Sequence, residues 1–308
     1  MKQSIKSTLM IGALCALLCS CGKTKAPVEE SLSDELTTTT VTETAAETEW
    51  DVHLHSQGDG RLRSVSFEVD GVTYRGVMAS GEIFLQELVT DLQTVEIPSH
   101  VAGHGSIRPW YVALELDCPN VKELTIGKNH KTFLLPEDSS DLFRAEKLTL
   151  DQSFLGFTEE YIDPKSYRDD PLRTPFPTGF AELREICVKY EKYGDPIWTT
   201  DGMLYAMRTL GTNSQSVLVC LPRNYPSENG TVILPERTAI IQTHAIWQCR
   251  NIDRLIIPEI VGKIDPEGIV ATAERPLTVV CAKGSAADEY VRLYGEQFHL
   301  TVEYLPEP

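Results

Sequence analysis

The sequence predicts a β-rich solenoid, in which repeated units stack so that one strand from each unit joins a parallel sheet along one side. Three observations indicate this fold class. A short apolar triplet occurs seven times, several of its copies are 22 to 24 residues apart, and two copies agree at further positions. One such unit cannot bury its own apolar face, so we expect neighbouring units to pack against one another, with turns or short helices on the opposite side.

Each copy of the triplet has an apolar residue three positions before a second and five before a third, which is the strand layout of leucine-rich repeats. Leu124 and Leu148 are 24 residues apart, and Val232, Leu255 and Leu277 follow at intervals of 23 and 22. Chance apolar triplets in a β-rich protein are the alternative, and the copies with a polar first residue are the weakest. The copies are Leu92/Val95/Ile97, Val121/Leu124/Ile126, Ala145/Leu148/Leu150, Leu183/Ile186/Val188, Asn229/Val232/Leu234, Ile252/Leu255/Ile257 and Glu274/Leu277/Val279.

The amino terminus has the features of a secretion signal. Lys2 and Lys6 precede an apolar stretch, residues 9–18, that is too short to span a bilayer. The segment Leu18-Cys19-Ser20-Cys21 resembles the bacterial lipoprotein signal, in which an aliphatic, a variable and a small residue precede a lipidated cysteine. The resemblance implies a lipid on Cys21 and a mature chain outside the cytoplasm, held at the cell membrane. An ordinary cleaved signal is the alternative.

The segment after Cys21 is rich in Thr, Glu, Ala and Ser and almost lacks apolar side chains. It cannot bury enough apolar surface to offset the entropy of ordering, so a disordered tether is expected, with an end-to-end distance of roughly 30 Å. The resulting domain organisation is a signal peptide at 1–20, a tether at 21–50, an N-terminal β-hairpin cap at 51–90 and a repeat domain at 91–305, with insertions at 151–180 and 197–230.

Caps are expected at both ends of the repeats. Residues 64–78 alternate apolar and polar side chains around the turn Asp70-Gly71, which predicts a β-hairpin. Residues 284–295 predict a helix, with Ser285 as N-cap and Gly295 at its end, followed by a strand at 300–305. Between the caps, 157–177 contains four prolines and predicts a long surface loop, while 201–206 and 218–222 predict a two-stranded ribbon.

The run from Thr238 to Pro258 is similar to the repeat of BspA-type leucine-rich repeat proteins of bacterial surfaces, Ile-x-x-x-Ala-Phe-x-x-Cys-x-x-Leu-x-x-Ile-x-Ile-Pro. Ile241, Ala245, Cys249 and Leu255 match in register, and Ile246 replaces the Phe. The similarity is good over 200–305, fair over 85–150 and poor over 151–180. It implies a β-rich solenoid and a role in surface binding or adhesion, and it specifies no ligand.

The outward positions of the repeat strands are the candidate binding residues. Side chains alternate between the two faces of a strand, so if the aliphatic residues face the core, the residues between them face outward. A parallel sheet would present them to a protein or glycan partner. A solvated sheet face is the alternative. The candidates for partner binding are Glu96, Glu123, Thr125, Lys147, Thr149, Glu185, Arg254 and Ile256.

Charge and motifs argue against other functions. The formal net charge of -17 and the lack of a Lys/Arg cluster argue against nucleic-acid binding. No cofactor fingerprint, phosphate loop or nucleophile elbow is present, so no cofactor and no enzymatic activity are expected. The weak metal candidates are His53 with His55, His100 with His104, and the segment 138–141, and a Cys187 or Cys220 pair with His244 is a remote nucleophile candidate.

Five cysteines follow the lipidation candidate: Cys118, Cys187, Cys220, Cys249 and Cys281. Their odd number and wide spacing argue against a disulfide framework, and core packing is the simplest interpretation. Cys118 and Cys249 occupy the same repeat position. The sequence thus favours a lipid-anchored binding module. A structural or accessory subunit of a cell-envelope complex, contacting its partner through 157–177, is the second hypothesis, and a hydrolase is the third.

Overall fold

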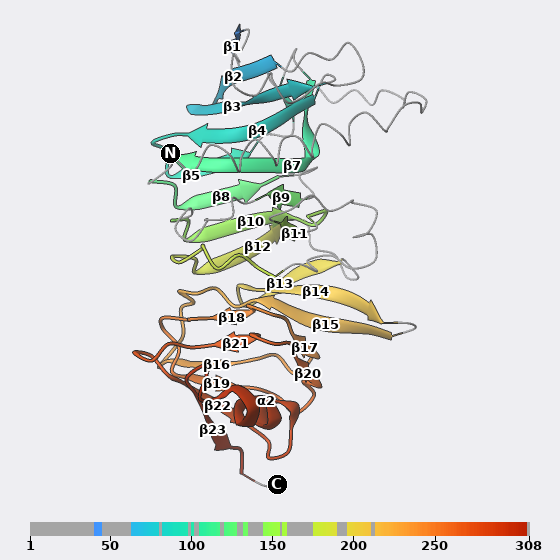
Figure 1. Ribbon diagram of the computed structural model, residues 1–308, viewed down its shortest axis with the longest axis vertical. Coiled ribbons are helices and arrows are strands. Elements are labelled where there is room, and N and C mark those ends of the chain that lie inside the picture. The colour runs from blue at the N-terminus through green and yellow to red at the C-terminus, as the bar shows by residue number, and fades with distance from the viewer. Residues whose placement is uncertain are drawn as a thin grey trace.

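The structure is a computed structural model of the 308-residue chain and forms an elongated stack of strands, with antiparallel strands at one end and a helix at the other (Figure 1). All statements below concern the residues that the structure describes. These are 40–44, 63–79, 82–97, 100–101, 105–117, 120–127, 132–134, 144–154, 156–158, 175–189, 196–210 and 213–306.

The first four copies of the triplet form a four-stranded parallel sheet, named here the N-terminal ladder. Its register aligns Val95, Leu124, Leu148 and Ile186, all at most 3% exposed, so the aliphatic residues face the core as the two-residue period predicts. The strands pair in their order along the chain. They are β5 (Thr94–Ile97), β8 (Glu123–Ile126), β10 (Lys147–Asp151) and β12 (Glu185–Lys189).

The last three copies and the C-terminal strand form a second four-stranded parallel sheet, the C-terminal ladder. Val232, Leu255 and Val279 are in register and buried. The predicted alignment of the last copy is wrong, because Val279 rather than Leu277 lies beside Leu255, an interval of 24 residues instead of 22. The parallel sheet on one side of the solenoid is thereby confirmed, but it is divided in two between β12 and the next ladder strand. The strands of this sheet are β16 (Thr231–Ile233), β19 (Arg254–Ile256), β22 (Leu277–Cys281) and β23 (Leu300–Tyr304).

The first position of the triplet is less regular than the other two. Val121, Leu183 and Ile252 are buried there, whereas Leu92 is 40% exposed. Asn229 is exposed too and has a positive φ of 55°, because it forms a tight turn with Gly230 instead of entering the core. The first triplet position is therefore not a regular core position, since local turn chemistry determines the backbone where the residue is polar.

Short strands and turns, rather than short helices, form the opposite side of the solenoid in the described residues. Parallel pairing joins most of them, as it does the ladders. They are β4 (Glu82–Val89), β7 (Gly105–Asp117), β9 (Thr132–Leu134), β11 (Gly156–Thr158), β17 (Ile240–Ile241), β18 (Ile246–Trp247), β20 (Lys263–Ile264) and β21 (Ile269–Val270), with β6 (His100–Val101) antiparallel to β7.

The predicted N-terminal hairpin is confirmed as β2 (Arg63–Val69) and β3 (Val72–Ala79). Asp70 and Gly71 have φ of 51° and 78°, the left-handed backbone that an Asp-Gly turn supplies. β4 continues the antiparallel sheet and then pairs in parallel with β7, so this cap passes directly into the repeats.

One short part of the predicted tether 21–50 is described by the structure, and it forms a strand. Thr40–Thr44 form β1, antiparallel to β2. Its β-branched residues favour a strand, and the free edge of β2 offers unpaired backbone groups to it. The rest of the tether lies outside the described residues, as does the signal peptide.

The predicted ribbon is three-stranded rather than two-stranded. β13 (Ile197–Thr200), β14 (Met203–Leu210) and β15 (Asn213–Cys220) pair antiparallel, and β15 then pairs in parallel with β17. The segment 197–230 is therefore not a pure insertion, because its last strand belongs to the repeat stack.

The ribbon separates two hydrophobic cores. Leu204 and Ala206 pack into the core under the N-terminal ladder, whereas Met203 and Tyr205 pack into the core under the C-terminal ladder. Alternate side chains of β14 point to opposite faces, so one strand serves both cores. In Figure 1 the ribbon lies between the two ladders and extends beyond the stack at its turn.

The C-terminal cap agrees with its prediction. The helix α2 spans Ala286–Tyr294, and its N-cap is Ser285, whose hydroxyl accepts a hydrogen bond from the Asp288 backbone. Tyr290 is buried against the last repeat, and its hydroxyl donates to the Ile269 carbonyl at 3.2 Å. β23 follows and pairs with β22.

Candidate binding surface

The N-terminal ladder brings six of the eight candidate binding residues onto one face. Register places each residue beside its equivalents on the neighbouring strands, which lie about 4.8 Å apart. The residues between them point inward and are buried. The first outward row is Thr94, Glu123, Lys147 and Glu185, and the second is Glu96, Thr125, Thr149 and Cys187.

Lys147 lies at the centre of the first row and is the cation of this part of the face. Its ammonium is 3.5 Å from the carboxylate of Glu185 on the next strand. Electrostatic interaction with Cys187 and then with Glu185 raises the pKa of Lys147, so the ammonium stays charged at neutral pH. The Cys187 thiol donates to the same carboxylate at 3.2 Å. The three side chains form one polar cluster that spans β10 and β12.

A second ion pair crosses the face. Lys189 Nζ on β12 lies 3.0 and 3.1 Å from the two carboxylate oxygens of Glu96 on β5, so this pair reaches across β8 and β10. A side chain at Gly127 would come within 3.3 Å of the Glu96 carboxylate, so glycine leaves room for the pair. Asp151, in register with Lys189, is only 4% exposed and accepts two hydrogen bonds from Ser153. Asp151 therefore shapes the turn and is not part of the accessible surface.

The other two candidates, Arg254 and Ile256, lie on the C-terminal ladder and do not share this surface. The Arg254 guanidinium forms a two-pronged ion pair with Glu303, at 2.5 and 2.9 Å. Hydrogen bonding within the pair raises the pKa of Arg254 and lowers that of Glu303. Ile256 lies beside Ile233, which is 66% exposed. This second face is thus partly aliphatic, whereas the face of the N-terminal ladder is polar.

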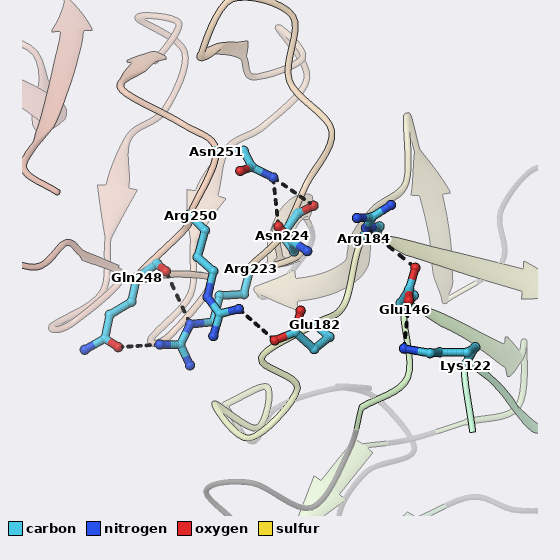
Figure 2. A network of polar contacts seen from close by, with 9 residues as sticks. All are labelled: Lys122, Glu146, Glu182, Arg184, Arg223, Asn224, Gln248, Arg250 and Asn251. Carbon is cyan, nitrogen blue, oxygen red and sulfur yellow. Dashed lines mark hydrogen bonds and ion pairs between the residues drawn. The ribbon is translucent and has the colours of Figure 1, made fainter. Parts of the chain in front are cut away.

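The sequence did not predict a third polar arrangement that the structure contains. It lies at the edge where the ladder strands begin, and Figure 2 shows its members from both halves of the solenoid. Glu146 is 3.0 Å from Lys122 and 3.7 Å from Arg184, and hydrogen bonding from Lys122 is the main cause that lowers the pKa of Glu146. Glu182 forms an ion pair with Arg250 at 2.7 Å, across the division between the ladders. The sequence signal was a polar residue just before several of the triplet strands, as at Lys122, Glu146 and Arg184.

Amide and guanidinium groups continue this edge. Arg223 donates to the side-chain oxygen of Gln248 at 2.9 Å and to its backbone carbonyl at 3.3 Å. The Asn251 amide donates to the side-chain oxygen of Asn224 at 2.8 Å, in the manner of a stacked asparagine pair (Figure 2). Equivalent positions of successive repeats therefore contact one another through polar groups at this edge.

His244 and Cys220, which the sequence suggested as members of a nucleophile pair, are placed as follows. The His244 imidazole lies 3.1 Å from Glu267 and packs edge-on against Trp247. Burial raises the pKa of the Cys220 thiol well above its usual value, and it raises that of Cys249 to about 12. Buried thiols of this kind are poor nucleophiles.

Several predicted features lie outside the described residues. They include Cys21, His53, His55, His104, Cys118, the segment 138–141 and all but the ends of the loop 157–177. Phe176 and Phe180, near the end of that loop, pack in the N-terminal core, so the chain re-enters the stack there. Among described residues, no helix is long and apolar enough to cross a bilayer, and no group of three His, Cys, Asp or Glu is placed to hold a metal ion.

The ladder register and the repeated triplet together define the class of the protein, a β-rich solenoid of leucine-rich repeats. Two solved structures are similar to the chain. One is a leucine rich cell surface protein from Faecalibacterium prausnitzii, with 12% identity and a TM-score of 0.31 over 79% of this chain and 95% of that one. The other is a leucine-rich repeat protein from Eubacterium ventriosum, with 11% identity and a TM-score of 0.28 over 71% of this chain and 66% of that one. No family model and no curated protein matches the sequence.

Proposed function

We propose that this chain is a lipid-anchored extracytoplasmic binding module, and that the outward face of the N-terminal ladder binds a protein or glycan partner at the cell surface. The observation that carries the proposal is the ladder register, which brings Glu96, Glu123, Lys147 and Glu185 from four strands onto one polar face. A rigid sheet holds such side chains in fixed positions, which reduces the ordering cost of binding.

The face is suited to many weak polar contacts. Ion pairs hold Lys147 with Glu185 and Lys189 with Glu96, while Glu123 is exposed between two strands. Thr125 and Thr149 add hydroxyl groups that both donate and accept hydrogen bonds. The arrangement contains no chemistry that would need a cofactor, and its charges favour a partner with a complementary pattern.

Charge reversal tests the binding face. In one variant Glu123→Lys, Lys147→Glu and Glu185→Lys are combined. The matched control is the exchange Arg75→Glu with Glu87→Arg, which reverses an exposed charge pair in the N-terminal cap and keeps it paired. We expect the affinity of the first variant for whole bacterial or host cells to be at least tenfold lower than that of the unchanged protein, while the control binds normally. Equal binding by all three proteins would contradict the proposal.

The class of partner follows from treating the cells before binding. Loss of binding after protease digestion indicates a protein, and loss after periodate oxidation indicates a glycan.

Lipid attachment is tested separately through Cys21→Ala, with Cys19→Ala as the matched control. We expect only Cys21→Ala to abolish labelling with radioactive palmitate and to release the chain from the membrane fraction. Labelling that survives Cys21→Ala would contradict the lipid anchor and leave the binding face untouched.

A further inference from the structure

Five consecutive turns of the solenoid each place one basic residue at the edge where the ladder strands begin. These residues, named here the basic rim, are Lys122, Arg144, Arg184, Arg223 and Arg250; Arg144 is exposed three residues before β10, and the other four are drawn in Figure 2. Lys122, Arg184 and Arg250 are shown in Figure 2 on both sides of the division between the ladders. The sequence does not reveal the rim, because its members are 22 to 40 residues apart along the chain.

Backbone hydrogen bonds hold the rim together even where the sheet is divided. The amide of Glu146 donates to Lys122 O and that of Arg184 to Glu146 O, both at 2.7 Å. The amide of Asn224 then donates to Leu183 O and that of Arg250 to Arg223 O, both at 2.8 Å. The turns are therefore stacked continuously. With a strand spacing of about 4.8 Å, the five basic residues extend over roughly 20 Å.

The rim is accessible and rich in cations. The side chains of Lys122, Arg184 and Arg250 are 44%, 58% and 43% exposed. Two carboxylates, Glu146 and Glu182, form the ion pairs of Lys122, Arg184 and Arg250, so the five basic residues outnumber the acids paired with them, in a chain whose formal net charge is -17. Such an arrangement of cations favours an anionic ligand.

The groups beside the cations are polar. Gln248, Asn224 and Asn251 contribute amides, and Asn120 is exposed at the start of the row. Of the exposed large apolar side chains of the described residues, Leu92 lies at this edge, one turn before Lys122, whereas others such as Ile233 and Leu293 belong to other parts of the fold. Protein interfaces usually have apolar or aromatic side chains at their centre, so the rim is better suited to a hydroxyl-rich ligand than to an acidic protein segment.

We propose that the basic rim binds an acidic polysaccharide, a sugar chain with carboxylate or sulfate groups, which lies along the solenoid axis. Arginine guanidinium groups bind planar carboxylates in a two-pronged manner, and the amides donate to sugar hydroxyls. The rim begins beside the face of the N-terminal ladder, since Lys122 precedes Glu123, but its residues are different, so the inference extends the proposed function to a second site and stands without it.

The test measures binding of the full chain to polygalacturonate, dextran sulfate, neutral dextran and poly-L-glutamate. We expect binding to at least one of the two acidic polysaccharides, at least tenfold tighter than to dextran or poly-L-glutamate, and weaker as salt screens the charges. The two acidic polysaccharides distinguish carboxylate from sulfate recognition.

The rim variant combines Lys122→Glu, Arg184→Glu and Arg250→Glu, and a milder variant carries Gln at the same positions. The matched control reverses three exposed cations elsewhere, Arg75→Glu, Lys283→Glu and Arg292→Glu. We expect both rim variants to lose at least tenfold in affinity for the polysaccharide and the control to lose less than threefold. Thermal unfolding confirms that each variant is folded.

Three results would overturn the inference. They are no binding to either acidic polysaccharide, tighter binding to poly-L-glutamate, which would indicate an acidic protein segment instead, or an equal loss of affinity in the control variant. None of these results bears on the cell-binding test of the N-terminal ladder, whose variant residues are different.

Discussion

At the scale of single residues, turn geometry determines where the repeats depart from their pattern. Asn229 and Gly230 both have positive φ, 55° and 70°. The Asn-Gly pair is a strong turn signal in any sequence, yet the triplet spacing predicts Asn229 as a core position. The second and third triplet positions were predictable because burial there is set by the strand. The first position was not, since a local turn competes with it.

Gly230→Ala is expected to destabilise the protein. Its Cβ would be 2.6 Å from a carboxylate oxygen of Asp253, and the left-handed backbone adds strain, so we expect a loss of about 1–3 kcal/mol. Gly262→Ala is the matched control, because its Cβ would have no atom within 4 Å. Urea unfolding measures both. Addition of Asp253→Ala should restore part of the stability of Gly230→Ala; an unchanged loss would mean that the steric explanation is wrong.

The buried thiols predict a dependence on alkaline pH. Burial raises the pKa of Cys249 to about 12, against an ordinary value of 9.0. The unfolded chain therefore loses this proton first as the pH rises. The contribution of the protonated Cys249 thiol to the free energy of unfolding is complete below pH 9, and it is lost progressively as the pH increases from 9 to 12. Cys249→Ala should flatten this part of the stability profile measured by chemical denaturation at a series of pH values.

Alkylation at pH 8.5 gives a second measurement of the same property. Cys187 and Cys249 are both half-buried and Cys220 is buried, but the pKa values of Cys249 and Cys220 are raised, so mass spectrometry should find Cys187 modified first in the native protein. Modification of all three at equal rates would be inconsistent with these pKa values.

At the scale of elements, strands and caps were largely predictable and the ribbon was not. Each of the seven triplets overlaps a strand, because alternating aliphatic residues fit a half-buried strand wherever they occur. The hairpin and the helix have local turn and capping signals. The three-stranded ribbon depends on contacts between β14 and two separate cores, which no local pattern encodes.

The cap of α2 allows a test at this scale. Ser285 accepts a hydrogen bond from the Asp288 amide, and the Asp288 carboxylate accepts one from the Gly284 amide at 2.8 Å. Ser285→Ala should cost about 1 kcal/mol, and Ser285→Asp should cost much less because it retains an acceptor. Leu293→Ala, on the exposed side of the same helix, should change stability by less than about 0.5 kcal/mol. Thermal unfolding distinguishes the three; equal effects would argue against a capping role.

At the scale of the whole molecule, the ribbon predicts two separate cooperative units. Leu218 packs in the C-terminal core and Val219 in the N-terminal core, although they are adjacent in the sequence. Because each repeat contacts only its neighbours, a substitution that removes packing in one core should destabilise mainly the ladder above that core. We expect Leu218→Ala to lower amide protection most in 231–300 and Val219→Ala to lower it most in 94–188, as measured by hydrogen exchange. A uniform loss in both variants would indicate a single unit.

The fold class and its parallel ladder followed from the sequence, whereas the division into two sheets and the basic rim did not. Lys122, Arg184 and Arg250 lie along one edge only because the turns stack. The spacing along the chain does not reveal which polar residues share that edge. The candidate residues of the N-terminal ladder were predictable as a group for the opposite reason, since strand register alone brings them together.

The ribbon also governs how changes in side-chain volume can be accommodated. An enlarged side chain under one ladder requires a smaller neighbour only within the same compartment, because β14 and β15 stand between the two compartments. The two ends of the rod can therefore be redesigned, lengthened or exchanged one at a time, provided that the face of the ribbon toward the untouched end is preserved.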